Sequence, residues 1–394
     1  MTERFKNWSR SLEFTPEHIA RPQSTEKLQA LVREIAADGG RCRVVGQGHS
    51  SSPLVNTDET LISLEKMSGV ESVDSDAHEA WVRPGTTLEQ MGEELLDDDL
   101  AVHNLGDVNV QQLGGAIGTG THGTGKHLGN LSTMLLGLRM VTADGELIER
   151  HIEDDEEFIR AARVSLGTLG IFASLRIRVQ PAYRLHRLEM CASVDDCMEH
   201  LTELVESNRN FDFYWYPRSD EVKLRTLNRP GESPDMPFAT VVKEEVEWAP
   251  RIIARTRDLR FDEMEYCLPA MAGPIAFQQV RRRMLDVHRR DVAWRTLYRT
   301  TAPDDALLSP SYRRETAVMS VHHNASLPHD AFFADIEPIL TAHHGRPHWG
   351  KKHNMRAAEL ATRYPEWNTF LEIREAMDPD GVFINDYLRD LFGV

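Results

Sequence analysis

A histidine lies in a loop rich in glycine and serine close to the N-terminus. In RCRVVGQGHSSSPLVNT, residues 41–57, the apolar pair Val44 and Val45 is followed by two glycines, His49 and three serines. This order predicts a short buried strand that ends in a loop with an accessible backbone. The roles open to His49 are structural hydrogen bonding, general base catalysis, metal binding, and covalent attachment of a cofactor through a ring nitrogen.

A second segment is richer still in glycine. NLGDVNVQQLGGAIGTGTHGTG, residues 104–125, has six glycines between Gly114 and Gly125. Glycine lets backbone N–H groups come close to a ligand, and a run of such groups forms a concave anion-binding surface. Two such loops, about 65 residues apart, predict a ligand with a pyrophosphate. For either loop alone, tight turns without a ligand remain an alternative.

The pattern GxGxxG occurs at Gly118, Gly120 and Gly123. A Rossmann fingerprint opens a helix and is followed by an acidic residue about 20 positions later. Here the glycines run into KHLGNLSTMLLGL, where no helix start fits. We therefore exclude a Rossmann fold and keep the glycine loops as a different kind of nucleotide site.

Metal binding by histidine requires several ligands at short spacing. No partners lie near His49, and the histidines at 343, 344, 348 and 353 lack an HExxH arrangement. The four cysteines, at 42, 191, 197 and 267, form no CxxC pair and are expected to be buried free thiols. The sequence therefore predicts no metal site.

The elements around the two loops alternate between helix and strand. Residues 24–40 fit an amphipathic helix, in which Ser24 and Thr25 stand as caps before Leu28, Leu31, Val32 and Ile35. Residues 41–46 fit a buried strand, and 61–102 fit strands followed by a helix capped by Thr86 or Thr87. Residues 135–150 fit a hairpin with an Asp144-Gly145 turn. Near Pro181 the composition shifts to aromatic strand-like pieces such as FDFYWYP, which indicates a domain boundary.

Length and charge limit the class of protein. A chain of 394 residues favours two domains, and its net charge of −17 argues against a nucleic-acid partner. No stretch approaches the roughly 20 apolar residues of a membrane span. The N-terminus MTERFKNWSRSLEF has no apolar core of a secretory signal, so we expect a cytoplasmic protein.

The segment VVGQGHSSSPLVNTDETLISLEKMSGV resembles the pyrophosphate loop of the vanillyl-alcohol-oxidase-like flavoenzymes, most closely the sugar-1,4-lactone oxidases such as gulonolactone and arabinonolactone oxidase. The resemblance runs in order from Trp8 to Phe392. It implies an α+β fold: a PCMH-type FAD-binding domain of two α+β subdomains (1–180), a cap with an antiparallel sheet (181–345), and a C-terminal segment (346–394) that returns to the FAD domain. It continues through NLGDVNVQQLGGAIGTGTHGTG, VTADGELIE, GTLGIF, MEYCLP, DDALLSPSYRRET, GRPHWGKKHN and AMDPDGVFINDYLRDLF.

The resemblance also implies the cofactor, FAD, covalently bound through His49. A small residue beside the flavin, here Gly106, is typical of oxygen-using members. The remaining positions that it assigns to cofactor binding are Val45, Gly46, Gln47, Gly48, Ser50, Ser51, Pro53, Gly114, Gly115, Gly118, Thr119, Thr121, His122, Gly123, Gly170, Ile171, His348 and Asn385.

The catalytic residues implied in the same way are Lys351, Arg299 and Glu265, and strand periodicity adds His322. Lactone and alditol oxidases commonly carry a Glu-x-Arg pair on a cap strand, and here Leu297 stands in place of the glutamate. A histidine of alditol oxidases aligns with Ser320. Because residues 320 and 322 face the same side of a strand, His322 is expected to reach the pocket.

The function implied is an FAD-dependent oxidase of a sugar-1,4-lactone such as gulono-, galactono- or arabinono-lactone. A CH–OH group gives a hydride to flavin N5, and molecular oxygen becomes hydrogen peroxide. The alternatives are an alditol or polyol oxidase acting on xylitol, sorbitol or glycerol, an oxygen-independent lactone dehydrogenase, and a flavoprotein without catalysis. Retention of Lys351, Arg299 and Glu265 argues against the last.

Overall fold

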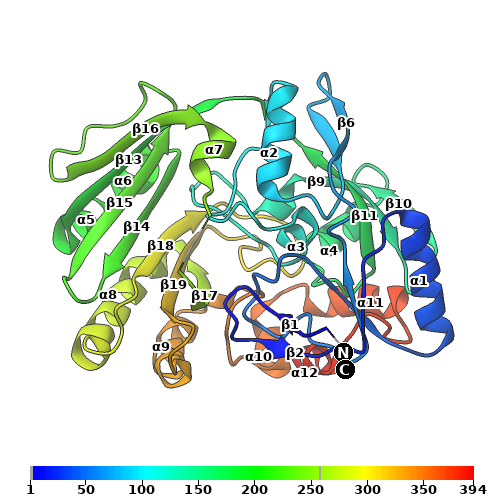
Figure 1. Ribbon diagram of the computed structural model, residues 1–394. Coiled ribbons are helices and arrows are strands. Elements are labelled where there is room, and N and C mark those ends of the chain that lie inside the picture. The colour runs from blue at the N-terminus through cyan, green and yellow to red at the C-terminus, as the bar shows by residue number, and fades with distance from the viewer. Residues whose placement is uncertain (1–2, 257–258) are drawn as a thin grey trace.

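A small parallel sheet begins the fold and ends at the first glycine loop. The computed structural model describes residues 3–256 and 259–394 (Figure 1). Strands β3 (His18–Ala20), β5 (Thr60–Ser63) and β4 (Cys42–Val45) pair in that order, all parallel. Helix α1 (Thr25–Ala37) connects β3 to β4, with Ser24 as its N-cap and Leu28, Val32 and Ile35 buried, as the sequence predicts.

A second sheet of five antiparallel strands completes the N-terminal half. The predicted hairpin is formed by β9 and β10, with Gly145 at a φ of 78° in its turn. Thr87 caps α2 (Leu88–Asp97) by accepting a hydrogen bond from Gln90 N–H. The mixture of helices and sheets confirms the α+β class. The sheet order is β10 (Leu147–His151), β9 (Leu135–Val141), β11 (Ile171–Arg178), β7 (Glu79–Val82) and β6 (Val70–Asp74), with α4 (Glu156–Ala162) beside it.

The second glycine segment contains a helix that the sequence did not suggest. Helix α3 (Leu113–Gly118) forms in the middle of the glycine run. Gly118, the first glycine of the GxGxxG pattern, ends this helix instead of opening one. The chain then continues without a further α-helix to a 3-10 turn at Leu131–Met134. The exclusion of a Rossmann fingerprint is therefore consistent with the backbone.

The predicted cap is an eight-stranded antiparallel sheet. Along β17, Met264 and Tyr266 join the apolar core, whereas Glu263 and Glu265 face a cavity. This alternation gives the sheet one face covered by helices and one polar face. The helices are α5 (Val194–Glu199), α6 (Leu201–Ser207), α8 (Gly273–Arg283) and α9 (Asp330–Ala342). The strand order is β16 (Thr240–Trp248), β13 (Arg184–Ser193), β15 (Glu221–Asn228), β14 (Asn210–Tyr216), β18 (Thr296–Thr301), β19 (Thr316–Asn324), β17 (Phe261–Pro269) and β20 (Arg346–Pro347).

The C-terminal segment returns to the N-terminal half, close to the chain's first strands (Figure 1). Cys42 N–H donates to Val382 O, and Arg41 pairs with Asp386 at 2.9 Å. β20 extends the cap sheet two residues past 345, and the boundaries between the parts stay predictions. The helices of this segment are α10 (Ala357–Arg363), α11 (Trp367–Met377) and α12 (Asp386–Phe392).

The remaining elements are short. Within the described ranges, no helix is long and apolar enough to cross a membrane.

Cys42, Cys197 and Cys267 are buried free thiols as expected, but the expectation is wrong for Cys191, which is exposed on β13. The other elements are β1 (Phe5–Lys6), β2 (Glu13–Phe14), β8 (Leu100–Ala101), β12 (Gln180–Pro181), α7 (Ala249–Ile253), a 3-10 turn at Ala270–Ala272 and a π turn at Met284–His288.

One buried arginine connects three distant segments. Arg43, on β4, is 2% exposed. Its Nε donates to Leu54 O at 2.8 Å, and its Nη2 donates to Leu166 O at 2.6 Å. Nη1 donates to Gly167 O and to Phe383 O. Burial lowers the pKa of Arg43 to about 10, so it stays charged at neutral pH, and the carbonyl oxygens that it contacts stabilise that charge.

Replacing Arg43 with leucine should strongly destabilise the protein. Arg43→Leu leaves the buried carbonyls without donors, and we expect the free energy of unfolding to fall by about 3–5 kcal/mol. Urea unfolding followed by circular dichroism measures this. The control is Arg33→Leu, at a surface pair whose arginine is 49% exposed, which should change stability by less than about 0.5 kcal/mol. Equal losses in the two variants would contradict the role given to Arg43.

Candidate active site

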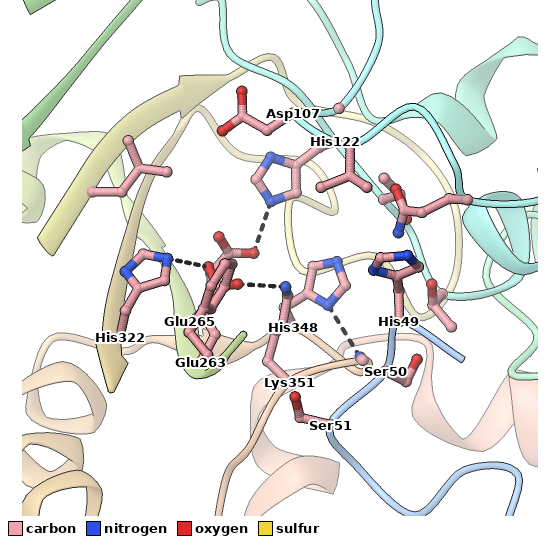
Figure 2. A pocket seen from close by; sticks show the side chains of 18 of the residues that line it. His49, Ser50, Ser51, Asp107, His122, Glu263, Glu265, His322, His348 and Lys351 are labelled. Carbon is pink, nitrogen blue, oxygen red and sulfur yellow. Dashed lines mark hydrogen bonds and ion pairs between the residues drawn. The ribbon is translucent and has the colours of Figure 1, made fainter. Parts of the chain in front are cut away.

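Two cavities meet at the first glycine loop. One, of about 900 Å³ including its open mouth, lies against the polar face of the cap sheet (Figure 2). The other, of about 940 Å³, lies among the glycine segments of the N-terminal half. The residues that line both are His49, Ser50, Gln111 and Thr119. A single elongated ligand can therefore extend from one cavity into the other.

The second cavity is lined largely by backbone. A Cβ added to Gly115 or Gly118 would meet no protein atom within 4 Å, so the space in front of these glycines is open. Gly48 has a φ of +66°, a conformation that favours glycine. Glycine-lined backbone at a turn is suited to the pyrophosphate of a dinucleotide. The residues present fit FAD.

His49 stands where the cavities join. Its ring stacks on Trp8 with centroids 5.2 Å apart. Burial, together with the charge of Lys351, lowers the pKa of His49 to about 4. At neutral pH the ring is therefore uncharged and keeps a nitrogen lone pair, which covalent attachment to a cofactor requires.

A pair of carboxylates on β17 dominates the first cavity. Glu265, 1% exposed, accepts from His122 Nε2 at 3.0 Å and from Arg299 Nη2 at 2.8 Å. Burial opposes its charge, but His122 and Arg299 outweigh burial and hold the pKa of Glu265 well below its usual range. Glu265 is therefore ionised.

Glu263 repeats this arrangement two residues earlier. It accepts from Lys351 Nζ at 2.5 Å and lies 3.3 Å from His322 Nε2 (Figure 2). Burial again works against the charge, yet Lys351 and His322 hold the pKa of Glu263 well below normal. The same contact with Glu263 outweighs burial at Lys351 and raises the pKa of its ammonium group.

The two histidines have similar surroundings. His122 Nδ1 lies 2.9 Å from Gly123 O, and His322 Nδ1 lies 2.9 Å from Arg295 O. The other nitrogen of each ring faces a carboxylate. Each ring is therefore held between a backbone carbonyl and a buried carboxylate. Each carboxylate is thus contacted by one imidazole ring and by one cationic side chain, Arg299 or Lys351.

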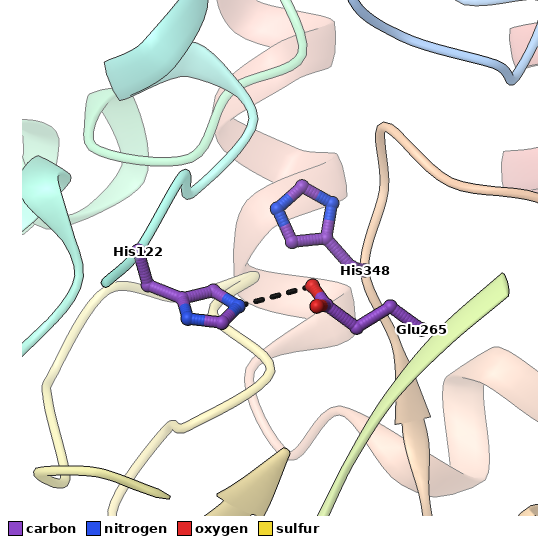
Figure 3. Close-up of side chains that lie close together, drawn as sticks. All are labelled: His122, Glu265 and His348. Atoms are coloured by element: carbon purple, nitrogen blue, oxygen red, sulfur yellow. Dashed lines mark hydrogen bonds and ion pairs between the residues drawn. The ribbon is translucent and has the colours of Figure 1, made fainter. Parts of the chain in front are cut away.

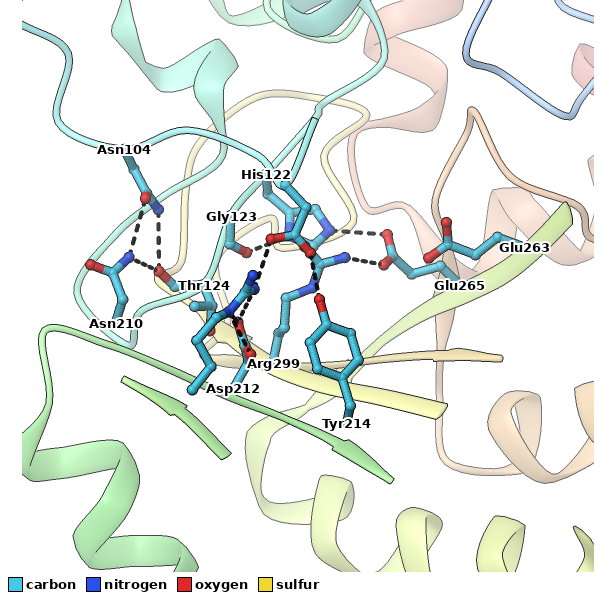
Figure 4. Close-up of polar contacts among 12 residues, drawn as sticks. Asn104, His122, Gly123, Thr124, Asn210, Asp212, Tyr214, Glu263, Glu265 and Arg299 are labelled. Carbon is cyan, nitrogen blue, oxygen red and sulfur yellow. Dashed lines mark hydrogen bonds and ion pairs between the residues drawn. The ribbon is translucent and has the colours of Figure 1, made fainter. Parts of the chain in front are cut away.

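A second ionic cluster ties the glycine segment to the cap (Figure 4). Asp107 accepts from Arg225 at 2.7 Å and from Tyr214 OH at 3.2 Å. Behind it, Arg225 also pairs with Asp212. Asn210 Nδ2 donates to Thr124 O at 2.6 Å. These contacts fix the distance between the glycine segment and the polar face of the sheet.

Three side chains have the spacing of a metal site, which the sequence did not predict. Ligand atoms of His122, Glu265 and His348 lie within 4.8 Å of one another (Figure 3). Glu265 is already engaged by His122 and Arg299, and His348 Nδ1 accepts from Gly350 N–H at 3.0 Å. Burial lowers the pKa of His348 to about 3, so its ring is neutral. Hydrogen bonding accounts for the grouping.

The structure brings most predicted residues to the cavities. All four predicted catalytic residues, Lys351, Arg299, His322 and Glu265, line the first. The predicted cofactor residues found there are His49, Ser50, Ser51, Gly106, Thr119, Thr121, His122 and His348. Those in the second are Val45, Gly46, Gln47, Gly48, His49, Ser50, Gly114, Gly115, Gly118, Thr119 and Gly170.

Four predicted cofactor residues, Pro53, Gly123, Ile171 and Asn385, lie outside both cavities. Ile171 is a core residue, 1% exposed. Asn385 donates to the carbonyls of Pro53 and Asn56 and so fixes the first loop from behind. Gly123 packs so closely that an added Cβ would lie 2.2 Å from the carbonyl oxygen of residue 105. These residues support the site instead of lining it.

The strand register shows how Arg299 obtains a carboxylate partner although Leu297 stands in place of the family's glutamate. Leu297 pairs with Ser320, and Ser320 pairs with Glu265. A carboxylate for Arg299 is therefore supplied from β17, two strands away from Leu297. Ser320 and His322 alternate with the core residues of β19 and so share a side, as expected. Several residues of this cavity were not predicted from the sequence: Glu263, Asp107, Tyr214, Arg295, Phe261 and Trp8.

Two family models match the chain. The D-arabinono-1,4-lactone oxidase family matches residues 175–249 and 237–391, and an FAD binding domain matches 16–150. The L-gulono-1,4-lactone dehydrogenase of Mycobacterium tuberculosis H37Rv is 34% identical over 100% of both chains. The L-gulonolactone oxidase of Scyliorhinus torazame is 27% identical over 100% of this chain and 99% of its own. A Streptomyces alditol oxidase is 26% identical, with 99% of each chain covered.

Solved structures share the fold at low identity. Cholesterol oxidase from Brevibacterium sterolicum has a TM-score of 0.87 and 14% identity, over 100% of this chain and 97% of its own. Glucooligosaccharide oxidase from Acremonium strictum, described with a 6-S-cysteinyl, 8α-N1-histidyl FAD, has a TM-score of 0.80 and 16% identity, over 99% and 94%. The fold is therefore that of the vanillyl-alcohol-oxidase-type flavoenzymes.

Two glycine variants should separate cofactor binding from folding. Gly115→Ala places a methyl group in open cavity space, so the protein should fold normally and retain less FAD. Gly123→Ala places one against Leu105 O and should prevent stable folding. The flavin-to-protein absorbance ratio and the unfolding midpoint of the apoprotein measure the two effects. Normal FAD content in Gly115→Ala would show that the ligand does not pass over α3.

Proposed function

Because the chain belongs to the D-arabinono-1,4-lactone oxidase family, we propose that its two cavities hold FAD and a sugar-1,4-lactone, whose CH–OH group it oxidises at the expense of oxygen. The chain is an FAD-dependent oxidoreductase. In the overall reaction proposed, the CH–OH group loses two electrons and two protons to become a carbonyl, and one molecule of oxygen takes up both to become hydrogen peroxide. The identity of the acceptor, the covalent link to His49 and the cytoplasmic location are parts of the proposal.

The observation that carries the proposal is the position of His49 at the junction of the two cavities. On one side lies a backbone-lined space that fits a dinucleotide, and on the other a polar space lined by Glu263, Glu265 and Arg299. An uncharged histidine at such a junction is suited to hold the reactive ring of the cofactor between them. FAD, when bound, supplies the hydride acceptor that no amino-acid side chain provides.

The protein's own residues bind and orient the substrate. Glu263 and Glu265 are ionised and can only accept, so they bind hydroxyl groups of the sugar. Lys351 and Arg299 are held charged by these carboxylates. Fixed positive groups in a largely buried cavity stabilise the negative charge that develops on the hydroxyl oxygen as its proton leaves. Leu297 gives the same cavity an apolar wall.

Oxygen as the acceptor is supported by Gly106, which lines the first cavity. A Cβ at this position would lie 3.1 Å from Thr121 Cγ2 and 3.3 Å from His122 O. Any side chain would therefore crowd this wall or occupy the cavity. Because a relative is named a dehydrogenase, an electron acceptor other than oxygen is the alternative. Because another relative is named an alditol oxidase, an open-chain polyol is the alternative substrate.

Covalent attachment predicts a yellow, fluorescent pellet after acid precipitation of the wild-type protein. His49→Ala should release its flavin into the supernatant, because the bond to the ring nitrogen is absent. Ser50→Ala changes the adjacent residue and should keep its flavin in the pellet. A colourless wild-type pellet would mean that FAD is bound without a covalent link.

The lactone and oxygen steps are separated by anaerobic mixing. L-gulono-1,4-lactone should bleach the flavin absorbance without oxygen, and admitting air should restore it with one peroxide per lactone oxidised. Gly106→Val should slow the return of absorbance more than it slows bleaching, since the side chain crowds the wall beside the cofactor. Bleaching by xylitol but by no lactone would favour the polyol alternative. Rapid bleaching with slow recovery in the wild type would favour a dehydrogenase.

A further inference from the structure

Arg295 lines the first cavity, and no carboxylate among residues 3–256 and 259–394 pairs with it. Among the described residues, no ion pair or side-chain hydrogen bond involves its guanidinium group, and its Nε is buried and unpartnered. The group lies over the ring of Tyr214, 4.4 Å from the centroid. Its backbone is fixed, because His322 Nδ1 donates to Arg295 O at 2.9 Å. The guanidinium is thus held in place and left with unused donors.

The described carboxylates of this cavity are engaged elsewhere. Glu263 binds Lys351, and Glu265 binds Arg299. Asp107 accepts from Arg225 and lies 3.9 Å from Arg299 Nη1. An arginine with unmet donors inside a cavity is suited to an anionic group on the ligand.

Leu297 gives a second, independent indication. It lies in β18, two residues after Arg295, which immediately precedes that strand, and both side chains line the cavity. A glutamate at 297 would place a negative charge beside Arg295, which would repel an anionic ligand or neutralise the arginine. Leucine at 297 brings no such charge, and Arg299 is bound by Glu265 from another strand. The charge of Arg295 is therefore available to a ligand.

We propose that the preferred substrate carries a carboxylate, bound by Arg295, at the end remote from its lactone ring. The inference rests on the proposed function and specifies its substrate class: a sugar-1,4-lactone whose terminal CH2OH is replaced by a carboxylate. The planar guanidinium matches a carboxylate in a two-bond arrangement. Stacking on Tyr214 orients the group before the substrate arrives.

The test compares L-gulono-1,4-lactone with the corresponding lactone in which the terminal CH2OH is oxidised to a carboxylate. Steady-state oxidation by the holoenzyme gives kcat/KM for each. We expect the carboxylated lactone to be preferred by about 10- to 100-fold, the range of a charge-assisted hydrogen bond. The preference should appear mainly in KM and should weaken as salt is raised.

Three variants assign the preference to Arg295. Arg295→Gln should reduce the ratio of the two kcat/KM values towards one, and Arg295→Lys should keep part of it because the charge remains. The control is Arg313→Gln, which removes an arginine that stacks on Tyr312, 5.1 Å from that ring and outside the cavity. It should retain the wild-type ratio. Flavin content establishes that each variant is folded.

The outcomes separate this inference from the proposed function. If the neutral lactone is oxidised as well as the carboxylated one, the inference is wrong and the proposed function stands. If Arg295→Gln keeps the wild-type preference, another group binds the carboxylate and the inference is wrong. If neither lactone bleaches the flavin, the proposed function fails and the inference fails with it.

Discussion

Two buried carboxylates on one strand are the constraint around which the cavity is organised. Glu263 and Glu265 project from the same side of β17, and each is nearly inaccessible to water. Burying one carboxylate without a partner costs several kcal/mol, and two close together also repel each other. Each is neutralised by groups from other segments. Glu263 uses β19 and the C-terminal segment, whereas Glu265 uses β18 and the second glycine loop. The pair is satisfied only when these segments have come together.

This arrangement also positions the cofactor space. His122 contacts Glu265 and follows closely on Gly118, the last residue of α3, in the segment that lines both cavities. Lys351 contacts Glu263 and lowers the pKa of His49, which stands at the junction. The ionic network of the cap and the backbone-lined cavity are therefore coupled through few residues. The network needs no glutamate at position 297, because Glu265 supplies the carboxylate for Arg299 from another strand.

The sequence was sufficient to predict elements that depend on interactions between neighbouring residues. The cap at Ser24, the apolar spacing of α1 and the Asp144-Gly145 turn depend on neighbours in sequence, and all were predicted. Helix α3 was missed because a glycine run has low helix propensity, and tertiary packing overrides it. Lys351, Arg299 and Glu265 came from the family resemblance, and His322 came from strand periodicity. Glu263 was missed although a Glu-x-Glu spacing on a strand indicates two carboxylates on one face. Its partner Lys351 is 88 residues away, so spacing alone gives no sign of the ion pair.

The net charge of −17 is compatible with an anionic small molecule in the cavity. The same charge disfavours nucleic acid because a polymer meets a wide surface, where the summed charge acts. A small carboxylate inside a cavity responds to groups within a few ångströms, because exposed charges are screened over about 8–10 Å at physiological salt. In this cavity, the described carboxylates Glu263, Glu265 and Asp107 are already engaged by Lys351, Arg299 and Arg225. The positive charge that remains for an anionic ligand is then that of Arg295, although the protein as a whole is acidic.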